Sequence, residues 1–203
     1  MSATEVTQLL EEWESRLRDL GAPCIERLRP GLTRAQVDAL TLEHDLHVSD
    51  EVAAIWMWHD GDTGPDNGLR GLTPMGRFFD LRGSLDNSRS LQRITFDGDD
   101  DGDYSDEDPG DELYFRRHYL MIIVDEDRLY VDCTPGTSGT SGTSTGLYLS
   151  HDLSRATRVD LLDRLRLWLD ALNRGLWRID TNGSWVVDAS QAPVDRFWPW
   201  LYT

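Results

Sequence analysis

Lysine is absent from this 203-residue sequence, so every strongly basic side chain is an arginine. P-loop NTPases need a loop lysine, ordinary protein kinases need a strand lysine, and pyridoxal-phosphate enzymes need a lysine for their Schiff base. The absence of lysine therefore excludes these three classes of enzyme.

Cysteine is scarce as well. The chain has two, Cys24 and Cys133, which lie far apart and form no CxxC pair. A zinc site needs more ligands at closer spacing, and a secreted disulfide scaffold normally has more cysteines. We therefore expect both thiols to be reduced and packed in the core, and we expect no metal site built on them.

Long apolar runs are missing too. The stretch over residues 120–124 is far too short to span a bilayer, and the first residues lack the basic start and apolar run of a signal peptide. We therefore expect a soluble protein with a cytoplasmic location. We expect no membrane partner.

Acidic residues, by contrast, are abundant. The sequence has 37 Asp and Glu residues against 20 arginines, which gives a formal net charge of −17. Such a surface repels phosphate backbones, so nucleic acid is not the expected partner. The same field attracts basic protein partners and speeds encounter with them, although solubility alone is an equally good explanation.

Apolar residues at helical spacing predict helices at both ends of the chain. We expect a first helix that ends at Gly21, a second from Thr33 to about residue 46, and a third from Ser49 that stops at Gly61 and buries His59. A long last helix, capped by Thr157 with Asp160, should end at Gly175.

Between these helices the pattern is typical of β-strands. We expect strands near residues 77–81, 113–115, 119–124, 128–133 and 146–150, with a short helix from Ser84 to about residue 91. The predicted fold class is α+β, with N-terminal helices, a central mostly antiparallel sheet and a closing C-terminal helix. We expect one domain over residues 1–203.

Four segments follow one another along the chain: LHVSDEVAAIWMWHDG, GLRGLTPMGRFFDL, YLMIIVDEDRLYVDCTPGTSG and GLYLSHDL. Together they resemble the SUKH superfamily, which includes the yeast cell-wall-assembly regulator and many bacterial toxin-immunity proteins. The resemblance covers about residues 35–175.

The resemblance implies a SUKH-like fold, no cofactor and no enzymatic activity. It also implies immunity, in which a small protein binds and neutralises a nuclease- or deaminase-type toxin. The residues that match the family's motifs, expected to be mainly structural, are Trp58, His59, Asp60, Gly61, Asp132 and Gly136. The acidic insertion over 97–112, the GTS-repeat loop within 134–146 and the aromatic tail over 176–203 depart from the family pattern.

The acidic insertion is the sharpest local feature, because ten of its sixteen residues are acidic and none is basic. It could contact a basic toxin domain by imitating a phosphate backbone, or it could be a solvated loop. A second interpretation is a calcium loop that begins at Asp97. The residues predicted to bind the partner are Asp97, Asp99, Asp100, Asp101, Asp103, Asp106, Glu107 and Asp108.

Other candidates for chemistry are weaker. His44 and His47 are one helical turn apart, but no further metal ligands follow at the right spacing, so a surface pair is favoured. The adjacent residues 150–152 have the residue types of a catalytic triad, but adjacency in sequence is not triad geometry. Trp177 and Trp185 are expected in the core, whereas the later aromatics of the tail fit the core and an interface equally well.

Three functions remain open. The first is an immunity protein that binds and occludes a toxin. The alternative is a regulatory scaffold or adaptor related to cell-wall assembly. The third is a calcium-responsive module or an uncharacterised enzyme.

Overall fold

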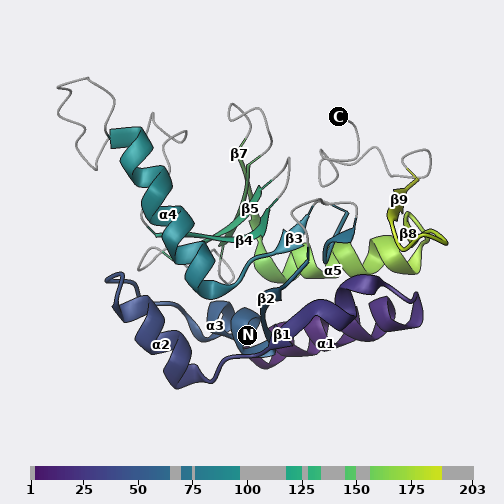
Figure 1. Cartoon of the computed structure of the whole chain (residues 1–203), viewed down its shortest axis with the longest axis horizontal. Coiled ribbons are helices and arrows are strands. Elements are labelled where there is room, and N and C mark those ends of the chain that lie inside the picture. Colours follow the sequence, from purple (N-terminus) through teal and green to yellow (C-terminus); the bar gives the residue numbers. More distant parts are fainter. Residues whose placement is uncertain are drawn as a thin grey trace.

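The computed structural model describes residues 3–64, 70–74, 76–96, 118–124, 128–133, 145–149 and 156–188. Its helices and strands form the α+β arrangement that the sequence predicts (Figure 1). The helices are α1 (Ala3–Asp19), η1 (Pro23–Arg27), α2 (Arg34–Leu42), α3 (Asp50–Trp58), α4 (Leu81–Phe96) and α5 (Leu161–Asn173).

The largest sheet has five strands in the order β3-β4-β5-β6-β7, and every neighbouring pair is antiparallel. Residues 119–123 are all buried, so both faces of β4 are covered, which explains why that strand is apolar without alternation. Helix α4 packs on β4, and α5 contacts β6 and β7. The strands are β3 (Arg77–Phe78), β4 (Tyr119–Val124), β5 (Arg128–Asp132), β6 (Thr145–Leu149) and β7 (Ala156–Asp160).

Two short two-stranded sheets complete the described structure. Strand β1 (Leu28–Pro30) pairs with β2 (His59–Asp62), and β8 (Trp177–Ile179) pairs with β9 (Trp185–Val187). The first sheet ties the N-terminal helices to β3, because β2 also contacts β3. The sequence pattern did not reveal either sheet, since strands of three or four residues are too short to show a clear alternation.

A group of four tryptophans forms the core between α1, α5 and the β8–β9 hairpin. The ring centroid of Trp13 lies 5.7 Å from that of Trp168, 6.0 Å from that of Trp177 and 6.5 Å from that of Trp185. All four side chains are buried, which confirms the core positions predicted for Trp177 and Trp185. Helix α1 therefore packs against the last helix through aromatic contacts rather than through the leucines alone.

Several predicted boundaries are wrong. Helix α2 ends at Leu42 because Asp45 adopts a left-handed conformation and the N–H of Leu46 bonds to the Thr41 carbonyl, which closes the helix. Helix α5 is capped by Asp160, whose side chain accepts from the N–H of Leu162, while residues 156–160 form β7. The predicted Thr157 cap therefore lies within a strand.

Two further corrections concern the ends of α3 and α4. Helix α3 ends at Trp58, so His59 is half-buried in β2 and does not belong to the buried face of the helix. Helix α4 begins at Leu81 rather than near Ser84, and it continues through residues 93–96, which resemble a strand in sequence. Its first N–H groups bond to side chains of Asp60 and Asp80, and the Asp60 acceptor comes from a distant segment.

Candidate functional site

The junction between α3 and β2 holds most of the residues that match the family motif. Trp58 Nε1 donates a hydrogen bond to Glu14 Oε2 at 3.0 Å, and His59 Nε2 lies 3.2 Å from the same oxygen. His59 Nδ1 lies 2.7 Å from the carbonyl oxygen of Arg29. Both neighbours of the imidazole are acceptors, so only a ring with a hydrogen on each nitrogen donates to both.

Glu14 is the centre of this cluster. Its other oxygen accepts a bond from Arg18, one helical turn further along α1. Burial acts to raise the pKa of the Glu14 carboxyl, but the hydrogen bonds from His59, Arg18 and Trp58 outweigh burial and lower the pKa below its ordinary value. The carboxylate therefore fixes the end of α3 against α1.

Asp60 and Gly61 position α4. The Asp60 carboxylate accepts from the N–H of Leu81 at 2.9 Å, which satisfies a free donor in the first turn of the helix. Gly61 has a φ of +76°, and a Cβ at this position would lie 2.5 Å from the backbone nitrogen of Asp80. No residue but glycine fits there without strain.

Asp62, which no sequence motif singles out, is the more buried of the two carboxylates of β2. Its side chain accepts from the N–H of Gly64 at 2.7 Å and from the N–H of Phe78 at 3.3 Å. The bond from Phe78 connects β2 to β3, whereas the bond from Gly64 closes a local turn. Asp132, by contrast, lies at the end of β5 and is buried there, away from this junction, whereas Gly136 lies outside the described residues.

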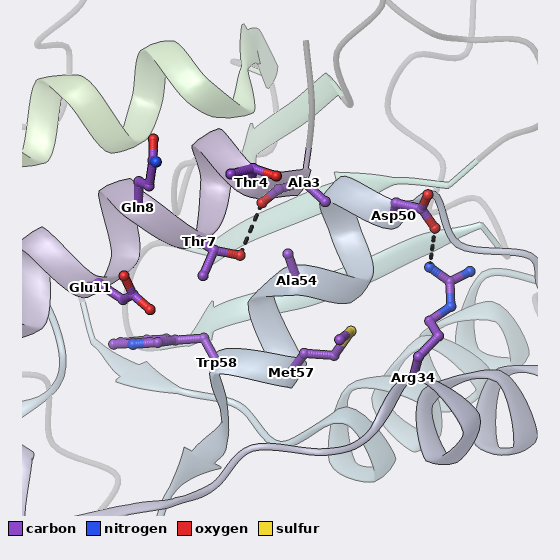
Figure 2. Close-up of a pocket in the computed structure, with 10 residues that line it drawn as sticks. All are labelled: Ala3, Thr4, Thr7, Gln8, Glu11, Arg34, Asp50, Ala54, Met57 and Trp58. Carbon is purple, nitrogen blue, oxygen red and sulfur yellow. Dashed lines mark hydrogen bonds and ion pairs between the residues drawn. The ribbon is translucent and has the colours of Figure 1, made fainter.

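A groove lies between α3 and α1 and adjoins this junction, because Trp58 belongs to both (Figure 2). Its volume is about 760 Å³. We call it the α1–α3 groove, and the residues that line it are Ala3, Thr4, Thr7, Gln8, Glu11, Arg34, Asp50, Ala54, Met57 and Trp58.

The floor of the α1–α3 groove is apolar. Ala54 is almost fully buried there, whereas Met57 is 42% exposed and Trp58 lines one end with its indole ring. A flexible thioether and an indole at the surface are typical of binding surfaces for other molecules. Sequence reasoning missed the groove, because Met57 and Ala54 read as ordinary helix residues until α1 is placed beside them.

The charges around the groove are negative on balance. Arg34 forms ion pairs with Asp38 and with Asp50, so these three side chains together carry one net negative charge. Glu11 adds another at the Trp58 end, and it forms no ion pair within the described part of the chain. The groove thus combines an apolar floor with carboxylates at its two ends.

The two thiols are unsuited to chemistry. Both are buried and reduced, as predicted. Burial is the main factor that raises the pKa of Cys24, to about 11, and it also raises the pKa of Cys133 well above its ordinary range. Neither side chain is a thiolate nucleophile near neutral pH.

Metal ligands do not gather in the described ranges, where no three His, Cys, Asp or Glu side chains could hold an ion together. His44 and His47 follow the end of α2. The calcium pattern and the predicted partner-binding residues, Asp97, Asp99, Asp100, Asp101, Asp103, Asp106, Glu107 and Asp108, lie outside the described residues, as do residues 150–152. None of the helices described is long and apolar enough to cross a membrane.

No protein-family model matches the sequence, and no curated protein matches it. The resemblance to the SUKH superfamily therefore stays a prediction from the four sequence segments.

Proposed function

We propose that this chain is a non-catalytic protein-binding module, an immunity protein that neutralises a toxin of nuclease or deaminase type. The observation that carries the proposal is the α1–α3 groove, in which an exposed methionine and an indole lie between carboxylates. Such a groove offers apolar contact area together with electrostatic selection for a basic partner.

Net charge supports the same proposal. A chain of charge −17 attracts a cationic domain over distances of about one Debye length, near 10 Å at moderate salt. Domains that bind nucleic acid are themselves basic, since they neutralise phosphates. An acidic protein can therefore occupy the same basic surface and exclude the substrate, and the acidic segment over 97–112 would add to this attraction.

The polar cluster around Glu14 supports the proposal that the chain is not a catalyst. Its carboxylate is held by Trp58, His59 and Arg18, and its role in the fold accounts for those bonds. The two cysteines are protonated and buried. Inhibition by stoichiometric occlusion requires only shape and charge, which the groove and the surface supply.

The test begins with a tagged chain incubated in lysate of its own cells at low and at moderate salt, with bound proteins identified by mass spectrometry. We expect one dominant partner that has a toxin domain. The purified pair should then form an equimolar complex that abolishes toxicity on co-expression, with an association rate that falls as salt rises. A spread of envelope-synthesis proteins would instead favour a regulatory scaffold, and a salt-independent rate would contradict the electrostatic part.

A further inference from the structure

We infer that the α1–α3 groove binds a basic amphipathic helix of the partner, with one apolar side chain on Met57 and two cationic side chains, about two helical turns apart, on Asp50 and Glu11. This inference deepens the proposed function and rests on it, because it names the element that the groove recognises. It is carried by the placement of charge and apolar surface within one groove (Figure 2).

The length of the groove defines the spacing of the two cations. Asp50 and Trp58 are the first and last residues of α3, and Glu11 lies at the Trp58 end of the groove. Eight residues of helix rise about 12 Å, which is slightly more than two turns. Residues at positions i and i+7 of a second helix are about 10 Å apart and on one face, so their long side chains reach both carboxylates.

The walls of the groove favour a helix over an extended strand. Both walls are α-helices, whose backbone N–H and C=O groups are bonded within each helix. An extended segment would find no strand edge there and would leave its own backbone groups without partners. A helix satisfies its backbone internally, so only side chains need to match the groove.

Charge complementarity selects the partner. Arg34 does not make the groove basic, because Asp38 and Asp50 both pair with it. Glu11 is an exposed carboxylate with no ion pair in the described structure. A second copy of this chain or a nucleic acid would bring more negative charge to the groove, whereas a basic helix would form a new ion pair with Glu11 and share Asp50 with Arg34.

The floor supplies the apolar contact that distinguishes a specific site from general attraction. Met57 is 42% exposed in the middle of the groove, and Ala54 beside it leaves space for an incoming side chain. A leucine or methionine at i+3 or i+4 of the bound helix lies between its two cations and reaches this floor. Methionine adapts its shape to such a contact.

The probe is a labelled, capped, alanine-rich peptide of about 16 residues that carries arginines at i and i+7 and leucines at i+3 and i+4. A control peptide has the same composition but carries its arginines at i and i+9, which lie on opposite faces of a helix. Binding to the intact protein is measured by fluorescence anisotropy at low salt. We expect saturable binding of the first peptide and at least about fivefold weaker binding of the control.

Two pairs of protein variants locate the contact. The double variant E11Q/D50N should weaken binding about tenfold, whereas E12Q/D86N, with the same change in net charge at exposed positions away from the groove, should change it less than about twofold. M57A should weaken binding about threefold, while L42A, at a 67% exposed position on α2, should not. Circular dichroism and thermal unfolding confirm that each variant is folded.

Equal binding of both peptides, equal effects of the two double variants, or no saturable binding up to about 1 mM peptide would overturn the inference. Its failure is distinct from failure of the proposed function. If the natural partner binds E11Q/D50N and E12Q/D86N equally and toxicity is still abolished, the chain is an immunity protein that uses another surface. If no toxin is neutralised, the proposed function fails whatever the peptides do.

Discussion

Glu14 and His59 are 45 residues apart in the sequence, yet the glutamate oxygen lies 3.2 Å from the imidazole Nε2 and joins α1 to the start of β2. The same oxygen accepts from the Trp58 indole. One carboxylate on the first helix therefore fixes both the last residue of α3 and the first residue of β2. Helix α1 thus orients the junction between α3 and β2.

Glu14→Gln should lower stability by about 1–2 kcal/mol at neutral pH, because hydrogen bonds to a charged acceptor are replaced by weaker bonds to an amide. The folded-state pKa of Glu14 is below its ordinary value, so its contribution is full above about pH 5 and is lost as pH falls through the lowered pKa. Urea unfolding of both proteins across this range measures the difference. A gap that stays constant down to about pH 3 would show that the charge of Glu14 is unimportant.

Gly61→Ala should destabilise the protein by about 3 kcal/mol, because a left-handed alanine is strained and its Cβ would meet the Asp80 backbone. Gly21→Ala is the matched control, since Gly21 has a φ of +68° and open space around its Cβ position. It should cost only about 1 kcal/mol. Equal losses in thermal unfolding would mean that the close approach to Asp80 contributes nothing.

Asp60→Ala should cost about 1 kcal/mol, because the N–H of Leu81 at the start of α4 would lose its acceptor. Asp60→Asn keeps an oxygen acceptor and should recover more than half of the loss. Asp86→Ala, at an exposed position in α4, serves as the control for general effects of lost charge. The comparison is made by urea unfolding, and an Asn variant as unstable as the Ala variant would argue against capping.

The parts of the fold that sequence could predict are those that depend on neighbouring residues. The helix starts predicted at Thr33 and Ser49 are both confirmed. Each cap is completed within four residues of chain, since Thr33 forms a capping box with Gln36 and Ser49 accepts from the N–H of Val52. Helix α4 begins at Leu81 rather than near Ser84, because the N–H of Leu81 bonds to the side chain of Asp60, 21 residues away. Local patterns carry no information on such a partner.

The candidate site likewise combines residues that a local motif reveals with residues whose role depends on distant parts of the chain. Trp58, His59, Asp60 and Gly61 were identified as a motif, but Glu14, which holds two of them, is one of many acidic residues in the first helix. The α1–α3 groove depends on the spacing between two helices, which only their packing determines. Asp62 was missed because a lone aspartate beside Gly61 looks like part of a turn, whereas it is buried and bonded to β3.

Both thiols are buried, and burial raises the pKa of each. Raised pKa values keep Cys24 and Cys133 protonated in the folded state, and the thiolate of Cys24 should form only as pH approaches about 11. Ellman's reagent near pH 8 should therefore react with neither cysteine of the native protein, and with both after unfolding in urea. Cys133→Ser should be less stable than Cys133→Ala, since a buried hydroxyl needs a partner that a thiol does not. Rapid reaction of a native cysteine would show that the core around it opens readily, since exposure and thiolate formation are both required for attack.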